Sequence, residues 1–166
     1  MNFKDLETFW WIAAESKELK ENVLKRRILN KDVVLFRGKD QSIVALKDQC
    51  IHRGARLSAG FLQDGNLVCP YHGWTYSKDG QVVDIPSEQK GAPKRCQKSY
   101  QVIEQDGYIY IQFKKSERGI KPFEMPKFPG EGYQNIKLIN KFEGEMLNCV
   151  ENFVDIPHTT LSLIHI

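Results

Sequence analysis

Two short segments of this sequence each pair a cysteine with a histidine. The first is Cys50-Ile51-His52, and Cys69-Pro70-Tyr71-His72 follows sixteen residues after it. Thiolate sulfur and imidazole nitrogen are ligands that transition metals favour. Because each segment carries one ligand of each kind, two facing loops would offer two sulfurs and two nitrogens. The constellation predicts a metal site rather than four unrelated residues.

Two kinds of metal centre compete for this donor set. A structural zinc site accepts two cysteines and two histidines in a tetrahedron, but its usual segments pair cysteine with cysteine and histidine with histidine. A Rieske-type [2Fe–2S] centre binds one iron through two cysteines and the other through two histidines. Mixed segments meet that demand, so we favour the iron–sulfur centre and keep a zinc-stabilised interaction module as the alternative.

The residues beside the two segments suit a cluster. Gly54, Gly60 and Gly73 are expected to let the backbone approach the cluster closely and to direct N–H groups at its sulfides. Tyr71 and Trp74 are expected to shield it from water, with simple core packing as the other interpretation.

Other polar residues nearby receive simpler interpretations. Asp48 is expected to be a turn residue. Arg53 and Arg56 are placed to raise the potential of the centre or to dock a partner. Cys96 and Cys149 have no histidine neighbour and are expected to be buried thiols, because a chain of this length does not need disulfides.

Composition narrows the class of protein. The 166 residues are 41% apolar, and 24 basic residues nearly balance 21 acidic ones. These values exclude a mainly disordered chain and argue against nucleic-acid binding. The sequence contains no apolar run near the length of a membrane span and no signal peptide at its start. We therefore expect a cytoplasmic protein without a membrane span.

The sequence around the two segments predicts short strands, which would hold them in place. From Asn22 to Phe113, β-branched and aromatic runs alternate with turn residues. The clearest runs are Val33–Phe36, Ile43–Leu46, Gln81–Ile85 and Tyr108–Ile111. Many short, closely spaced strands predict a mainly β fold, an antiparallel sandwich or small barrel.

The chain is expected to contain a complete domain and the beginning of another. Residues 1–113 form the predicted β domain, and the proline- and glycine-rich residues 114–132 form a connector. Residues 133–166 are expected to open an α+β domain, with a strand at Ile136–Phe142 and an interrupted helix at Glu145–His158.

The stretches Cys50–Ser58 and Cys69–Trp74 resemble the Rieske domain of ring-hydroxylating oxygenase α subunits, and the resemblance runs from about Phe9 to His158. It implies a two-loop cluster-binding subdomain in which Cys50 and Cys69 bind one iron and His52 and His72 the other. Respiratory Rieske proteins usually carry an additional cysteine in each loop. Neither loop here has one, which favours the oxygenase or ferredoxin branch.

The same resemblance extends to the segment that ends Asp155-Ile156-Pro157-His158. In that family an aspartate precedes the first histidine ligand of a mononuclear iron by three residues. It implies that Asp155 bridges cluster and iron between neighbouring subunits and that His158 binds the iron; a helix N-cap is the other interpretation of Asp155.

The mononuclear iron site departs from the family pattern. The family's second histidine ligand stands five residues after the first, where this chain has Leu163. His165 lies about 10 Å further along a helix than His158, too far to bind the same iron. Mononuclear Fe(II) is therefore expected only in the full-length protein.

Residues 161–166 are expected to be a sequencing artefact. Leu161-Ser162-Leu163-Ile164-His165-Ile166 is what the bases CTG TCT CTT ATA CAC ATC encode. Those bases match the transposon end used in common sequencing libraries. A genuine apolar helix end is the alternative.

The resemblance implies an oxidoreductase in which a ferredoxin or flavin reductase delivers electrons to the cluster. The electrons then reach the mononuclear iron, where O₂ hydroxylates or demethylates an organic substrate in a homo-oligomer, a trimer. This chain alone is expected to be inactive. The alternative is a stand-alone Rieske ferredoxin, but such proteins end near the last strand, here about Phe113.

Overall fold

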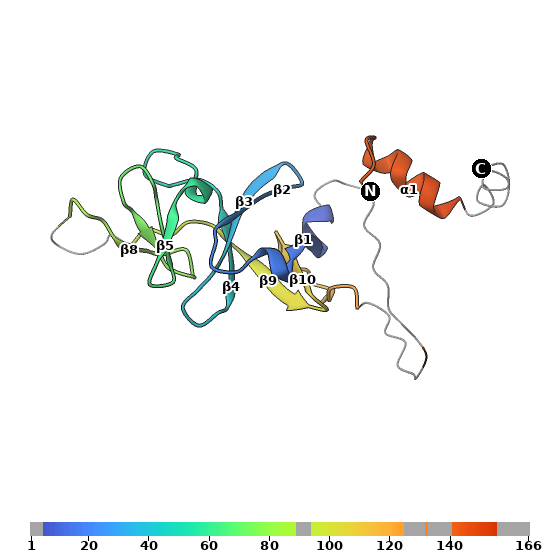
Figure 1. The fold of residues 1–166 in the computed structure, drawn as a ribbon. Coiled ribbons are helices and arrows are strands. Elements are labelled where there is room, and N and C mark those ends of the chain that lie inside the picture. The colour runs from blue at the N-terminus through green and yellow to red at the C-terminus, as the bar shows by residue number, and fades with distance from the viewer. Residues whose placement is uncertain (1–4, 89–93, 125–131, 133–140, 156–166) are drawn as a thin grey trace. The chain divides into compact units, whose positions relative to one another are not determined.

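A computed structural model describes residues 5–88, 94–124, 132 and 141–155 (Figure 1). Contacts between residues divide the chain into two units, Met1–Met125 and Pro126–Ile166. Each unit is described by itself. The predicted boundaries at residues 113 and 132 stay predictions.

The larger sheet of the first unit has six antiparallel strands. Their order is β1 (Trp11–Glu15), β10 (Tyr108–Gln112), β9 (Ser99–Gln105), β4 (Ile43–Lys47), β3 (Lys31–Arg37) and β2 (Leu24–Ile28). The sheet nearly closes on itself, because the Nε of Arg26 in β2 donates to the carbonyl of Ala13 in β1 at 2.9 Å. The predicted small antiparallel barrel is confirmed.

A smaller antiparallel sheet contains β5 (Phe61–Gln63), β6 (Asn66–Val68), β7 (Thr75–Tyr76) and β8 (Val82–Asp84), in that order. It lies near β3 and β4 and away from β1 and β10 (Figure 1). The described residues of this unit also form three short 3₁₀ helices: η1 (Asp5–Thr8), η2 (Ser16–Glu18) and η3 (Leu57–Ala59). The cysteine–histidine segments occupy the loops that follow β4 and β6.

Both faces of β3 are buried, which explains its continuous apolar run. Val33 and Leu35 pack with Ile109 and Ile111 inside the larger sheet. Val34 and Phe36 point the other way and join a cluster shared with the smaller sheet. That cluster also contains Val44, Leu46, Cys50, Leu57, Leu67, Cys69, Trp74, Tyr76, Val82 and Ile85. The two sheets are thus held together by the same core that contains both cysteines.

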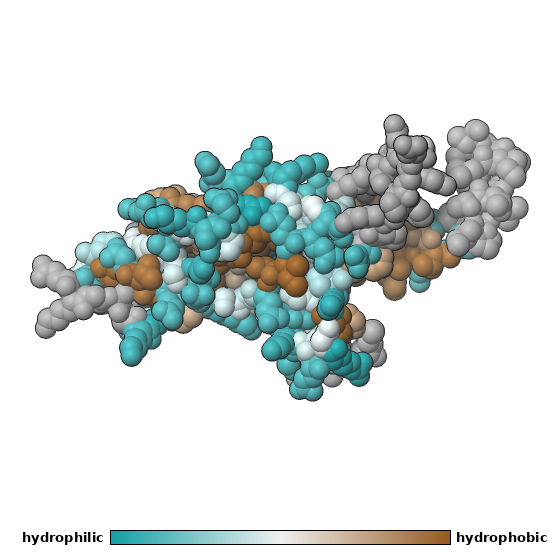
Figure 2. Space-filling view, turned by 90° about the horizontal axis from the view of Figure 1, so that it is seen from below, coloured by the Kyte–Doolittle hydropathy of each residue, from teal (hydrophilic) through white to brown (hydrophobic). Residues whose placement is uncertain are grey.

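Charged and polar side chains surround this core. Figure 2 shows mainly hydrophilic side chains over the visible face, with smaller hydrophobic patches between them. In the part of the chain that the structure describes, no helix is long and apolar enough to cross a membrane.

The described part of the second unit contains one helix, α1 (Met146–Val154). It begins one residue later than predicted, and Asp155 is its C-cap. The ring of Phe142 meets the ring of Phe153 edge-on, with centroids 5.7 Å apart. Most of the predicted strand at 136–142, and His158 with residues 161–166, lie outside the described residues.

Candidate metal centre

The first hook, residues 50–55, is a tight backbone ring. The amide of Cys50 donates to the carbonyl of Ala55 at 2.7 Å, and the amide of Gly54 donates back to the carbonyl of Cys50 at 2.8 Å. Gly54 has φ +74°, a left-handed conformation that glycine adopts without steric cost. Four residues thus reverse the chain and leave the side chain of His52 at the tip.

The second hook, residues 69–74, repeats the same ring. The amide of Cys69 donates to the carbonyl of Trp74 at 2.9 Å, and the amide of Gly73 donates to the carbonyl of Cys69 at 3.1 Å. Gly73 has φ +72°. Both hooks therefore have glycine at a left-handed position, and its close approach to a cluster stays a prediction.

Gly60 has a different role from the predicted one. A Cβ at this position would lie 2.0 Å from the carbonyl oxygen of Val68, so glycine is needed where the chain passes β6. Its contact is with a strand rather than with the hooks.

The structure brings the four predicted ligands together as two pairs. Cys50 and Cys69 are 3% and 2% exposed, and their thiols interact with each other: Cys50 helps to raise the pKa of the Cys69 thiol. His52 and His72 are exposed, with ring centroids 4.7 Å apart at 57°. The site therefore has a buried sulfur side and an exposed imidazole side.

The division of the four ligands into a sulfur pair and an imidazole pair helps to distinguish an iron–sulfur cluster from a zinc site. Among the described residues, no three or more His, Cys, Asp or Glu side chains are placed to hold a single metal ion. A Rieske cluster needs two sulfurs at one iron and two imidazole nitrogens at the other. The donor set fits that demand better than it fits four ligands around one zinc ion.

The sulfur of Cys69 receives hydrogen bonds from the backbone. Burial raises the pKa of this thiol, whereas the amides of Tyr71 and His72, which point at the sulfur, act in the opposite direction. Such amides stabilise negative charge on sulfur. The expectation that the backbone directs N–H groups at the sulfides of a cluster stays a prediction.

The sulfur of Cys50 faces Tyr76, a residue that the sequence did not single out. The Tyr76 hydroxyl lies 3.1 Å from the Cys50 sulfur and accepts a hydrogen bond from the amide of Ile51 at 3.2 Å. Burial raises the pKa of Tyr76, so the hydroxyl keeps its proton and can donate it to sulfur. Trp74, directly before β7, and Tyr76 within it belong to the same core cluster.

Each histidine is flanked by an aromatic ring. Trp74 stacks on His52 with centroids 4.7 Å apart at 6°, and Tyr71 lies 3.8 Å from His72 at 34°. Trp74 is also part of the core, which confirms the core-packing interpretation, whereas shielding of a cluster stays a prediction. Tyr71 is 62% exposed and covers its histidine from the solvent side.

Positive charges surround the imidazole side. The guanidinium of Arg95 lies 5.7 Å from the centroid of Trp74. Desolvation lowers the pKa of His52, and the charges of His72, Arg53 and Arg95 lower it further. A neutral imidazole is the form that binds metal.

Side-chain hydrogen bonds hold the residues that flank the first hook. Asp48, expected to be a turn residue, is buried at 5% exposure. Its two carboxylate oxygens accept hydrogen bonds from the amide and the hydroxyl of Ser58, both at 2.6 Å. The side-chain amide of Gln97 donates to the carbonyl of Gln49. Sequence alone pointed to neither Ser58 nor Gln97.

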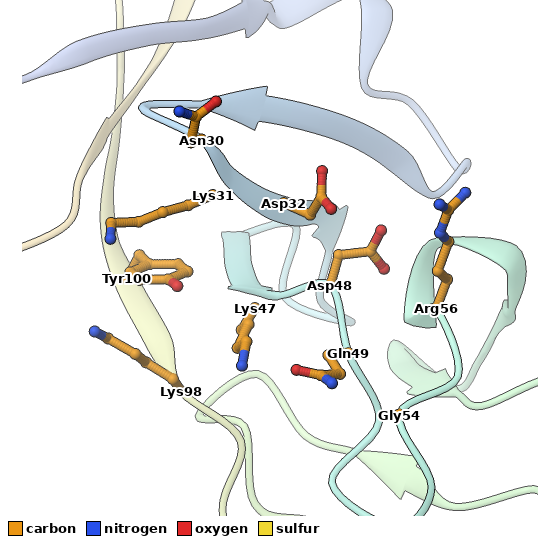
Figure 3. A pocket seen from close by; sticks show the side chains of 10 residues that line it. All are labelled: Asn30, Lys31, Asp32, Lys47, Asp48, Gln49, Gly54, Arg56, Lys98 and Tyr100. Carbon is orange, nitrogen blue, oxygen red and sulfur yellow. The ribbon is translucent and has the colours of Figure 1, made fainter.

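A cavity of about 540 Å³ lies beside the first hook. Asp48, Gln49, Gly54 and Arg56 form the wall nearest to the hook (Figure 3). Arg56 therefore faces this cavity, whereas Arg53 lies near His52.

The expectation that the remaining cysteines are buried was wrong for Cys96, which is exposed, and Cys149 is half-buried. The Cys96 thiol contacts the carbonyls of Asp79 and Gln97, each at 3.3 Å. It lies in an isolated bridge with Gln81 outside the named strands, where few side chains cover it.

Comparison with protein families gives a match to the Rieske [2Fe-2S] domain over residues 9–109. The chain belongs to this family. Its members bind a [2Fe–2S] cluster, in agreement with the pairing of sulfur and imidazole donors in the structure.

Several curated relatives of this Rieske chain are oxygenase subunits. The tert-butanol monooxygenase / tert-amyl alcohol desaturase oxygenase subunit of Aquincola tertiaricarbonis is 31% identical over 94% of this chain and 34% of its own length. The vanillate O-demethylase oxygenase subunit of Pseudomonas sp. strain HR199 is 39% identical over 61% of this chain and 28% of its own.

A crystal structure of dicamba monooxygenase with non-heme iron and dicamba matches with a TM-score of 0.65 at 36% identity. The match covers 74% of this chain and 38% of that one. The Rieske chain thus spans about a third of the length of the relatives that it matches.

Proposed function

We propose that the two hooks bind a Rieske-type [2Fe–2S] cluster and that the chain receives electrons for an O₂-dependent oxygenase. The observation that carries this proposal is the pairing of two buried thiols beside two exposed imidazoles. Cys50 and Cys69 would bind the inner iron, and His52 and His72 the outer one. When bound, such a cluster carries one electron at a time.

The sulfur side and the imidazole side of the site have different roles in this proposal. On the sulfur side, the core excludes water, and Tyr76 together with the second-hook amides donates hydrogen bonds that stabilise negative charge. On the imidazole side, the exposed rings of His52 and His72 form the edge through which an electron enters or leaves. The neighbouring Arg53 and Arg95 favour an acidic donor protein there.

An oxygenase explains the length of the match better than a ferredoxin does. The match to the Aquincola subunit covers 94% of the chain, well beyond residue 109, where the match to the Rieske family ends. We infer that the whole protein is an oxidoreductase that hydroxylates or demethylates an organic small molecule with O₂. Its electron donor would be a ferredoxin or a flavin reductase.

The iron site of the whole protein is also a proposal. His158 would bind a mononuclear Fe(II), and Asp155 would connect this iron to the cluster of a neighbouring subunit in a trimer. Asp155 lies at the end of α1, and its amide donates to the carbonyl of Glu151 at 3.0 Å. A cytoplasmic location likewise stays a prediction.

Anaerobic purification of the chain tests the cluster. We expect a red-brown protein with two irons and two sulfides per chain, and a paramagnetic resonance signal typical of histidine-bound clusters after reduction. A colourless zinc protein, or the signal of an all-cysteine cluster, would contradict the proposal.

The chain alone is expected to bind the cluster without oxidising substrate, because Leu163 stands where the second histidine ligand is needed. Product formation from a set of aromatic ethers, measured against the Cys69→Ala variant, checks this expectation. Turnover above that of the variant would overturn it.

A further inference from the structure

The two hooks share a backbone conformation but differ in how the fold holds them. The second hook closes the hairpin between β6 and β7, where Val68 pairs with Thr75 directly outside the hook. The first hook follows β4 of the larger sheet and leads through η3 to β5 of the smaller one. Its two ends therefore belong to different sheets.

Asp48 and Ser58 join the two ends of the first hook. Asp48 lies two residues before Cys50 in the sequence. Its carboxylate accepts hydrogen bonds from the amide and from the hydroxyl of Ser58, both at 2.6 Å. Both carboxylate oxygens are used in this contact, and the carboxylate is buried. These paired hydrogen bonds replace the strand ladder that closes the second hook.

Gln97, in the stretch directly before β9, also contacts this segment. Its side-chain amide donates to the carbonyl of Gln49, the residue directly before Cys50. Its side-chain oxygen accepts from the amide of Lys98 at 2.7 Å, and its own amide donates to the carbonyl of Gly80 at 2.7 Å. Gln97 is buried and is fixed by these two further hydrogen bonds, in addition to the one that it donates to Gln49.

We propose that Asp48, Ser58 and Gln97 form a brace that sets the position of the first hook relative to the second before any cluster is bound. These are positioning residues, and the inference rests on the proposed cluster site. The first hook connects two sheets, and such a connection can adopt many conformations. The brace restricts these conformations and so keeps Cys50 opposite Cys69. The second hook needs no such brace.

Two substitutions test the brace, each with a matched control in the same chain. Ser58→Ala removes the hydroxyl bonded to Asp48; its control is Thr75→Val, which removes the 3.1 Å hydrogen bond from Thr75 to the carbonyl of Gly73 in the second hook. Gln97→Ala removes the bond to Gln49. Its control is Gln112→Ala, because Gln112 is an equally buried glutamine that donates to the carbonyl of Thr8 at 2.7 Å, far from both hooks.

The first readout is cluster loss in the presence of a ferrous-iron chelator, followed by visible absorbance. We expect Ser58→Ala and Gln97→Ala to lose the cluster about tenfold faster than the unsubstituted chain. Both controls should stay within about twofold of it. Equal rates in the brace variants and their controls would overturn the inference.

The second readout does not involve the cluster. Amide hydrogen exchange in the cluster-free chain should rise over residues 49–58 in both brace variants, and stay unchanged over residues 69–74. Unchanged exchange over residues 49–58 would contradict the inference. If Ser58→Ala fails to fold, Gln97→Ala decides the question by the same two measurements.

The two proposals fail in different ways. If the unsubstituted chain binds no histidine-ligated cluster, the proposed function is wrong. If it binds one and the brace variants behave as their controls do, only the brace is wrong.

Discussion

The two hooks close the same hydrogen-bonded ring, yet the histidine is the third residue of the first hook and the fourth residue of the second. In each hook the cysteine is the first residue of the ring and lies in the core. The position of the histidine at the tip of the hook differs between the two. The backbone ring therefore sets where each cysteine lies within its own hook. The surroundings of each hook then decide what supports its histidine and its sulfur.

The largest effect is expected from removing the cysteine of either hook. Cys50→Ala and Cys69→Ala should each abolish cluster binding, because an iron with one remaining protein ligand is not retained. Iron and sulfide analysis with reduced-state paramagnetic resonance measures this. Cys96→Ala is the control, since Cys96 is exposed and lies outside the hooks, and it should bind a full cluster. A half-occupied cluster in either hook variant would contradict the proposed ligand set.

The aromatic partners of the histidines should differ sharply in what they contribute to stability. Trp74→Ala removes a buried core side chain and should lower the free energy of unfolding by about 3–5 kcal/mol. Tyr71→Ala removes a side chain that is mostly exposed and should cost less than about 1 kcal/mol. Urea unfolding followed by circular dichroism checks both values. Similar losses would show that the two histidines are supported alike.

The hook glycines should also differ, although both have positive φ. A Cβ on Gly73 would lie 2.7 Å from the Cγ of Pro86, whereas on Gly54 the nearest atom, Nε2 of Gln49, lies at 3.4 Å. Gly54→Ala should cost about 1–2 kcal/mol from backbone strain alone, and Gly73→Ala more, because the proline ring cannot move aside. Gly107→Ala, with φ +79° and open space around it, isolates the strain. Equal unfolding midpoints for all three would refute the steric difference.

The smallest expected effect concerns the sulfur of the first hook. Tyr76→Phe removes the hydroxyl that lies 3.1 Å from Cys50. Loss of this donor disfavours the more negative, reduced state, so the reduction potential should fall by about 40 mV, the one-electron equivalent of about 1 kcal/mol. Spectroelectrochemical titration measures the shift. Tyr100→Phe, a tyrosine of the larger sheet, should leave the potential unchanged.

Part of the fold was predictable because its signals are local. The strands around Val33–Phe36, Ile43–Leu46 and Tyr108–Ile111 were recognisable from β-branched runs between turn residues, and all three were found. The strand Trp11–Glu15 was not predicted, because its start is rich in aromatic residues and its partner, β10, lies almost a hundred residues away. The burial of Cys96 was predicted from residue type alone and was wrong.

The four candidate ligands and the family were recognisable from local sequence motifs. Each hook is a contiguous segment, so the spacing of cysteine, histidine and glycine within it already specifies a tight loop with two donors. The assignment of Asp155 and His158 rests on the same kind of local motif and stays a prediction.

Which donors meet, and which residues hold them, depends on the tertiary structure. The packing of the smaller sheet on the larger one buries the cysteines as one pair and leaves the histidines exposed as the other. Tyr76 reaches Cys50 across 26 positions of sequence, and Gln97 reaches Gln49 across 48. Such contacts depend on how the two sheets pack, and no spacing within one segment records that packing.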